Sequence, residues 1–258
     1  YFWMRLSDAQ KNAKTPDSQT QDVVNYLKAE NDYLDKVMDH TKQLQDTLYN
    51  EIVGRIKKDD ASVPVKDNGF EYYTRYEKGN DYPFYCRKPL DSDKEEIILN
   101  GPEMAKGYSY YGIGGQTVSP DNTMLVYGID TISRRQYTMY FKNLKTGTLL
   151  PDQLKNTSGG AVWANDNKTI FYATKDEQTL RQNKIFKHTI GTDQSEDELV
   201  FEETDETFNT FVYKTKSKSY ILIGSSQTLS TEFRFLDANT PNATPKIIQP
   251  REANLEYS

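Results

Sequence analysis

Residues 118–127 read VSPDNTMLVY, and residues 163–172 read WANDNKTIFY. Both stretches hold an Asp-Asn pair followed by an apolar run, and the offset between them is 45 residues. A third copy at residues 212–221 lies 50 residues after residues 162–171, and an earlier pair, Asp67-Asn68, lies 54 residues before the first pair. Asp and Asn tolerate unusual backbone angles, so each pair predicts a tight hairpin turn. The chain therefore repeats a strand–turn–strand pattern.

The repeats are larger than one hairpin. After each apolar run come a third strand, a second turn and a fourth strand, the fourth strands being predicted over residues 95–99, 148–150, 198–203 and 246–249. Four strands in about 45 residues are typical of a β-propeller blade. We therefore predict an all-β fold with four blade-like, four-stranded antiparallel units of an incomplete propeller at 61–258, the units covering about 62–100, 107–154, 160–205 and 208–252. A stacked sandwich is the alternative, although a sandwich does not require a repeat.

The first sixty residues follow a different period and predict an N-terminal helical arm over 1–60. Ser18 to Gln21 fits a capping box that starts a helix. Apolar residues then recur at steps of three, four and seven up to about Lys57, with a break predicted at 39–41; this stripe comprises Leu27, Leu34, Val37, Thr41, Leu44, Leu48, Ile52 and Ile56. We expect the arm to pack on its own domain. A partner-binding coiled coil is the alternative, but its flanking charges are irregular.

Composition excludes several classes of protein. The chain has 258 residues, of which 36% are hydrophobic, and its formal net charge is −6. Its mean hydropathy of −0.82 and the lack of any apolar run of about 20 residues exclude a transmembrane protein. The acidic balance argues against a general nucleic-acid binder. One cysteine, Cys86, and two histidines are too few for a disulfide framework or a metal cluster, so we expect no metal and no cofactor.

Several motifs resemble catalytic or phosphate-binding sequences. Gly112 to Gly115 lacks the spacing of a phosphate loop, and we interpret it as glycines that let the inner strand of a blade approach the crowded propeller axis. The serines in 157–160 and 224–226 do not fit a nucleophile elbow. His40 falls in the arm and His188 on a predicted strand, so neither is expected to act as a base for a serine. We therefore predict no catalytic residue in this chain.

Two charged motifs and the single cysteine have competing interpretations. The acidic run that starts at Ser195 and continues to Glu206 suggests attraction for a basic peptide, but we favour a solvated sheet edge. Cys86 alternates with aromatic residues, which favours core packing. Arg134 and Arg135 open a predicted strand, which places their side chains on opposite faces. One of them is suited to pair with a carboxylate across a domain interface, and a solvated strand end is the alternative.

Several segments together resemble one enzyme family. They are residues 1–5 (YFWMR), 48–56 (LYNEIVGRI), 59–64 (DDASVP), 82–87 (YPFYCR), 133–137 (SRRQY), 191–199 (GTDQSEDEL), 250–252 (PRE) and 256–258 (EYS). In this order they resemble the prolyl oligopeptidase family of serine peptidases, and within it the oligopeptidase B branch. The resemblance covers essentially the whole chain.

The resemblance implies a two-domain enzyme. An arm and a seven-bladed propeller precede an α/β-hydrolase domain that holds a Ser-Asp-His triad, and the arm packs on that domain. The propeller restricts entry to short peptides, which are cleaved after Lys or Arg. The family's nucleophile motif is absent here, so we expect this chain to be the N-terminal portion of a longer enzyme and to be inactive alone. Arg134 and Arg135 match a family segment that faces the cavity between the domains.

The expected partners follow from this resemblance. They are short basic peptides and the protein's own hydrolase domain. We also expect the open arc of blades to self-associate. We expect no nucleic acid and no membrane as partners. The single cysteine and the family suggest the cytoplasm, with the periplasm as the alternative, and the N-terminal residues do not decide between the two. The rival interpretation is a non-catalytic propeller scaffold that binds peptides or proteins. Reading the gene beyond Ser258 for more blades and a glycine-flanked serine distinguishes the two.

Overall fold

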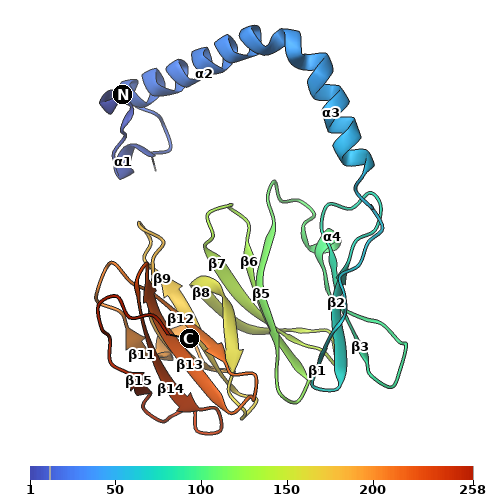
Figure 1. The fold of residues 1–258 in the computed structure, drawn as a ribbon, viewed down its shortest axis with the longest axis vertical. Coiled ribbons are helices and arrows are strands. Elements are labelled where there is room, and N and C mark those ends of the chain that lie inside the picture. Colours follow the sequence, from blue (N-terminus) through green and yellow to red (C-terminus); the bar gives the residue numbers. More distant parts are fainter. Residues whose placement is uncertain (12, 258) are drawn as a thin grey trace. The chain divides into compact units, whose positions relative to one another are not determined.

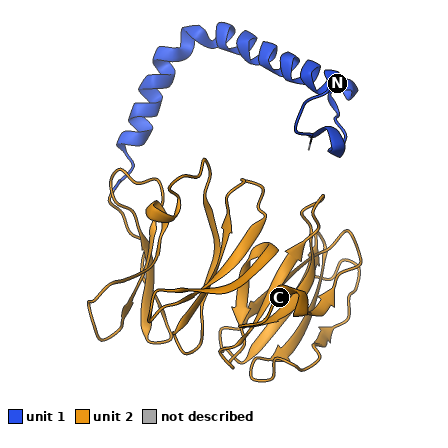
Figure 2. Ribbon diagram, turned by 180° about the vertical axis from the view of Figure 1, so that it is seen from behind, with its two compact units in different colours: residues 1–58 blue, residues 59–258 orange. Residues whose placement is uncertain are grey.

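A computed structural model describes residues 1–11 and 13–257 of the chain. The chain forms two compact units, Tyr1–Lys58 and Asp59–Ser258, which Figure 2 shows in different colours. The first unit is helical and the second is built from strands, which confirms the predicted fold class. Within the described ranges, no helix is long and apolar enough to cross a membrane.

The helical unit consists of two main helices joined by one tight turn. Helix α2 spans Ser18–Met38 and α3 spans Lys42–Gly54, and the 3₁₀ turn η2 at Asp39–Thr41 confirms the predicted break. Short turns precede them, namely η1 at Phe2–Met4 and α1 at Asp8–Lys11. The predicted capping box is wrong by one residue. Asp17 is the N-cap, and its carboxylate accepts a hydrogen bond from the N–H of Thr20 at 2.7 Å.

The second unit contains fifteen strands, a short helix α4 (Gly101–Met104) and a 3₁₀ turn η3 (Gln194–Glu196) among its described residues. The strands are β1 (Val65–Asp67), β2 (Phe70–Arg75), β3 (Phe84–Pro89), β4 (Glu96–Asn100), β5 (Gly112–Val118), β6 (Met124–Asp130), β7 (Tyr137–Asn143), β8 (Leu149–Trp163), β9 (Thr169–Lys175), β10 (Gln182–Thr189), β11 (Glu198–Glu202), β12 (Asn209–Lys214), β13 (Tyr220–Gln227), β14 (Ser230–Asp237) and β15 (Lys246–Gln249). Every pairing is antiparallel between neighbours in sequence, as in a series of meanders.

The strands form three sheets, which stand side by side in Figure 1. The orders are β1-β2-β3-β4, β5 to β11 in sequence, and β12-β13-β14-β15. We call β1–β4 the first repeat and β12–β15 the fourth. The second and third repeats are not separate sheets as predicted, because β8 is the last strand of one and the first strand of the next. Positive φ angles at Asn156 (55°) and Gly159 (94°) bend β8 between these two roles.

The Asp-Asn turns lie where the sequence predicts them. Asn68, Asn122 and Asn167 have φ values of 46°, 62° and 58°, in the left-handed region that asparagine tolerates. The turns of successive repeats also contact one another. The Asn68 amide donates to the carbonyl oxygen of Pro120 at 2.6 Å, and the N–H of Asp121 donates to the Asn167 side chain at 2.8 Å. The turns that the repeats share therefore also join neighbouring repeats. We call the end of the sheets at which these turns lie the turn end.

The offset predicted between the third and fourth repeats is wrong by one residue. Trp163 pairs with Ile170 in the third repeat, and Lys214 pairs with Ile221 in the fourth, which is an offset of 51. Lys218, with a φ of 61°, takes the place of Asn167. The error arose because the fourth turn has no Asp-Asn pair to fix the alignment. A shift of one residue exchanges the two faces of a strand.

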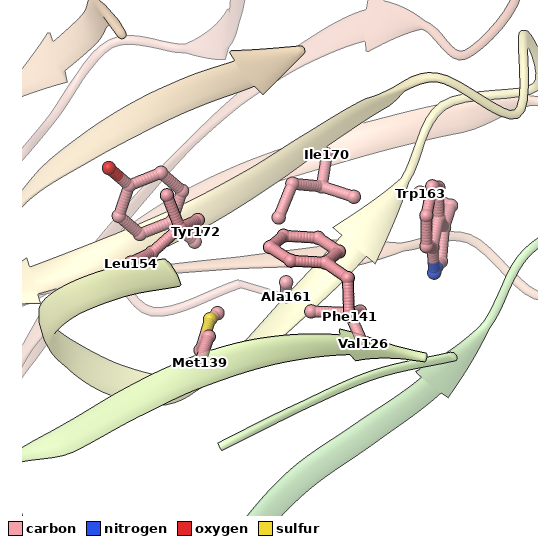
Figure 3. Packing of buried hydrophobic residues seen from close by; sticks show 8 residues of the cluster. All are labelled: Val126, Met139, Phe141, Leu154, Ala161, Trp163, Ile170 and Tyr172. Carbon is pink, nitrogen blue, oxygen red and sulfur yellow. The ribbon is translucent and has the colours of Figure 1, made fainter. Parts of the chain in front are cut away.

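The core lies between the faces of successive repeats. One cluster, shown in Figure 3, packs Met139, Phe141 and Leu154 of the second repeat against Trp163 and other residues of the third. A second cluster joins the third and fourth repeats, and a third cluster joins the first and second. Strands β6 and β9 each contribute buried residues to two of these clusters, so both faces of these strands are covered. Burial of one such side chain contributes about 1.5–3 kcal/mol, so the repeats stabilise one another and not only themselves.

Candidate functional site

The two arginines selected from the sequence lie in the loop between β6 and β7. The prediction that they open a strand is wrong, because β7 begins only at Tyr137. Ser133 and Arg135 have φ values of 63° and 57°, so the chain turns here instead of extending. The argument that placed the two side chains on opposite faces of a strand therefore does not apply.

Asp130, the last residue of β6, fixes the conformation of this loop. Its side chain is buried, and its carboxylate accepts hydrogen bonds from the N–H groups of Ile132 at 2.8 Å and Arg135 at 2.7 Å. Hydrogen bonds to a charged acceptor are stronger than neutral ones. They hold the left-handed residues in place, since such conformations persist only where the surroundings impose them. The backbone that carries Arg134 and Arg135 is therefore preorganised.

A third cation supports the loop from the neighbouring repeat. The Lys175 ammonium, at the end of β9, donates to the carbonyl oxygen of Arg135 at 2.7 Å and lies 5.6 Å from the centre of the Tyr137 ring. Burial lowers the pKa of Lys175, and the charge of Arg135 lowers it further. Both arginine side chains are exposed, and over residues 1–11 and 13–257 neither guanidinium makes a hydrogen bond or ion pair. The loop thus presents two unpaired guanidinium groups to solvent.

Glycines on β5, β6 and β8 allow the backbones of these strands to approach one another closely. A Cβ on Gly115 would lie 2.6 Å from the Cα of Gly160, and a Cβ on Gly128 would lie 2.6 Å from the carbonyl oxygen of Gly159. No side chain fits at either position, so β5 and β6 approach β8 backbone to backbone. The segment from Gly112 thus takes part in a close backbone approach, made to β8, and its approach to a propeller axis stays a prediction. The motif at 157–160, which we considered separately, supplies the other side of the same contact.

The two histidines have structural partners. His188 is fully buried on β10, with Nδ1 2.7 Å from a carboxylate oxygen of Asp197 and Nε2 3.5 Å from one of Asp152. His40 Nδ1 lies 3.0 Å from the carbonyl oxygen of Val37 in its own helical unit. Among the described residues, neither ring forms a hydrogen bond with a serine, and no group of His, Cys, Asp and Glu is arranged to hold a metal ion.

Cys86 and two carboxylates of the acidic run, Asp197 and Glu203, are buried. Burial of Cys86, which is 1% exposed, raises the pKa of its thiol to about 11, which confirms the core interpretation. The interpretation of the acidic run as a solvated edge is wrong in part. Asp197 pairs with His188, and Glu203 is buried and receives the Arg251 guanidinium. These carboxylates hold the third repeat together and join it to the fourth.

Sequence reasoning missed the residues that make the arginine loop rigid. Asp130 was not singled out, although an aspartate at the end of a strand and before polar residues is a common turn-forming signal. Lys175 gave no signal, because its contact with Arg135 spans two repeats and forty residues of chain.

The comparisons with known proteins agree with this geometry. The family model described as "Prolyl oligopeptidase, N-terminal beta-propeller domain" matches residues 9–258. The chain is 38% identical to dipeptidyl aminopeptidase BI of Pseudoxanthomonas mexicana and 30% identical to protease 2 of Moraxella lacunata. Both alignments cover 100% of this chain but only 36% and 37% of those proteins.

Two solved structures are similar over the whole chain. Oligopeptidase B from Leishmania major matches with a TM-score of 0.88 at 32% identity, and the match covers 36% of that chain. The closed form of oligopeptidase B from Trypanosoma brucei, with covalently bound antipain, matches with a TM-score of 0.86 at 29% identity and is covered to 35%. The present chain thus spans little more than a third of the length of its relatives.

Proposed function

The chain belongs to the prolyl oligopeptidase family as its N-terminal β-propeller domain, and from this premise we propose that it is the substrate-selecting part of a serine oligopeptidase. The complete enzyme hydrolyses short peptides after Lys or Arg, and the propeller excludes longer chains. The observation that carries this proposal is the similarity to two oligopeptidase B structures over 100% of the chain.

In this proposal the chemistry belongs to residues outside the chain. A Ser-Asp-His triad in an α/β-hydrolase domain supplies the nucleophile: the serine attacks the scissile carbonyl, and the histidine moves the proton to the leaving amine. In this proposal the present chain forms walls of the substrate cavity, selects substrates by size and contacts the hydrolase domain. Alone it is expected to be inactive.

Arg134 and Arg135 are the residues through which we propose that this contact is made. Their guanidinium groups are exposed and unpaired within the described ranges, on a loop fixed by Asp130. A planar guanidinium binds a carboxylate through two parallel hydrogen bonds. Because the loop is already ordered, little entropy is lost when the pair forms. A carboxylate of the hydrolase domain is the proposed partner in the closed state.

Peptide hydrolysis by the full-length gene product tests the function. The substrates are fluorogenic Arg-Arg amides with a free or a blocked amino terminus, compared with the same amides carrying Ala instead of Arg. Cleavage of the Arg substrates only, stopped by a serine-directed inhibitor and absent with this chain alone, supports the proposal. Cleavage confined to the free amino terminus would assign a dipeptidyl aminopeptidase activity, as the name of one relative suggests. No cleavage at all would favour the scaffold interpretation.

The role of the arginines has its own test in the full-length protein. Replacing both Arg134 and Arg135 by Ala is expected to lower kcat/KM by about five- to thirtyfold, since two exposed ion pairs contribute roughly 1–2 kcal/mol. The dependence of kcat/KM on salt should weaken with it. The matched control is Lys145→Ala with Lys168→Ala, which removes two exposed positive charges from the turn end. Equal effects of the two pairs would contradict the proposed contact.

A further inference from the structure

A cavity of about 590 Å³ lies among the repeats near the turn end. Its lining comes from the first repeat, from β5, β6 and the turn between them, from the end of β8, and from the end of β12 and the turn after it. This volume lies within the range of about 300–1,000 Å³ that is usual for small-molecule sites. None of these lining residues belongs to the arginine loop, so the cavity is separate from the candidate site above.

The walls of the cavity are mainly apolar and aromatic. Tyr72 and Tyr85 lie on the first repeat, Leu125 on β6, and Trp163 on β8. The Trp163 indole is buried, and its N–H donates to the carbonyl oxygen of Thr117 at 3.0 Å, so its ring is fixed. Flat, fixed walls of this kind suit an aromatic or aliphatic ligand body.

The charge of the lining is opposite to the charge of the whole chain. Lys214, Lys216 and Lys218 line the cavity, and Asp67 is the only acidic residue among the lining residues. The lining thus carries two positive charges in excess, in a chain whose formal net charge is −6. Low-dielectric walls of one charge sign concentrate the field and attract a ligand of the opposite charge.

The three lysines are not fully neutralised by neighbours. Lys214 is half-buried, and its acceptors among the described residues are the carbonyl oxygen of Trp163 at 2.8 Å and the Asn165 side chain at 2.6 Å; burial lowers its pKa. Lys218 forms an ion pair with Asp67. Lys216 is exposed and has no hydrogen bond or ion pair within the part of the chain that the structure describes. An anion at this rim would offset positive charge that the protein leaves unpaired.

We propose that this cavity binds a small amphipathic anion. Its aromatic or aliphatic body lies against the half-buried rings of Tyr72 and Tyr85, and its carboxylate or sulfonate lies at Lys216 and Lys218. The ligand joins the first, second and fourth repeats. Its binding therefore stabilises the folded propeller by mass action. This inference does not depend on the proposed peptidase function.

The probe for the test is 1-anilinonaphthalene-8-sulfonate, which combines an aromatic body and an anionic group. It is titrated into the full-length protein and followed by fluorescence and by isothermal calorimetry. We expect one saturable site. Lys216→Gln with Lys218→Gln should weaken binding roughly tenfold, since charged hydrogen bonds are worth more than neutral ones. The matched control, Lys145→Gln with Lys168→Gln, should leave the dissociation constant unchanged.

A second pair of variants tests the location without removing charge. Val65→Trp places a large ring at an exposed wall position of the cavity and should abolish binding, whereas Leu149→Trp at an exposed position outside the lining should not. Binding to several equivalent sites, or binding that these variants do not change, would overturn the proposal, because this probe also binds loosely packed apolar surface. If 3-phenylpropionate displaces the probe, the ligand class is a free small acid. If a peptide displaces the probe only when its C-terminal carboxylate is free, the ligand is the end of a peptide. Displacement by neither would overturn the carboxylate assignment.

Discussion

Replacing His188 by alanine is expected to destabilise the contact between the second and third repeats strongly. The imidazole is fully buried between Asp197, 2.7 Å away, and Asp152, 3.5 Å away, and both carboxylates are almost fully buried. Without the ring, Asp197 keeps the Tyr172 hydroxyl and Asp152 keeps the N–H of Gly191 as donors, each at 2.6 Å. Each carboxylate therefore keeps one donor, but Asp197 loses its contact with the ring, and the space between the two carboxylates is left empty.

The magnitude follows from a lost hydrogen bond to a buried carboxylate and from the cavity that the ring leaves. A hydrogen bond to a charged group contributes about 1.5–3 kcal/mol, and the cavity brings the total to about 3–5 kcal/mol. The ring also packs against Phe141, with centroids 5.5 Å apart, and a cavity at this point adds to the cost. A whole domain has only about 5–15 kcal/mol of stability, so this single change removes a large share of it.

Hydrogen exchange read by mass spectrometry on the full-length protein measures this effect locally. Peptides from β8 and β10 should exchange about a hundredfold to a few thousandfold faster in the variant, which corresponds to 3–5 kcal/mol. His40→Ala is the matched control, because His40 is the chain's other histidine and is exposed. If His188→Ala changes exchange in these strands no more than His40→Ala does, the reasoning about the buried carboxylates is refuted.

Three further predictions concern packing, pH and association. Gly115→Ala should lower the stability by about 1–3 kcal/mol, because its Cβ would overlap the facing backbone, whereas Gly160→Ala, whose Cβ meets nothing within 4 Å, should cost much less in the same thermal melts. Hydrogen bonds from Arg75 hold the pKa of Glu95 below its reference value of 4.5, so the stability that this pair contributes is present above about pH 4.5 and is lost as the pH falls through the folded-state pKa. Glu95→Gln should therefore flatten the fall in melting temperature between pH 5 and pH 3, and an unchanged slope would count against the pair. This chain on its own is expected to self-associate, because the arm leaves a row of large apolar side chains exposed. Light scattering should show Leu48→Lys reducing that association, and a monomer at high concentration without any substitution would contradict it.

The repeats were predictable from the sequence wherever an Asp-Asn pair marked the turn. Asn122 and Asn167 occupy equivalent positions at the expected offset, and both have left-handed φ angles. The alignment failed by one residue where Lys218 replaces the asparagine. Nothing local marked β8 as a strand shared by two repeats, because its bend depends on Asn156 and on contacts with strands from both sides.

The candidate site was predictable only in part. Arg134 and Arg135 stood out as a charged pair, but their loop conformation depends on Asp130, which forms its bonds only after β6 and the loop have folded. Lys175 arrives from the next repeat, so no local pattern indicated it. The buried pairing of His188 with two aspartates was missed for the same reason, since Asp152 lies on a strand assigned to a different repeat.

The size selectivity of the full-length enzyme tests the central claim most directly. The measurement compares kcat/KM for a short peptide with one internal Arg and for the same sequence embedded in a long unfolded polypeptide. The account predicts that the short peptide is cleaved and that the long polypeptide is cleaved far more slowly, because the propeller restricts entry. Equal kcat/KM values for the two substrates would contradict a selecting role for this chain.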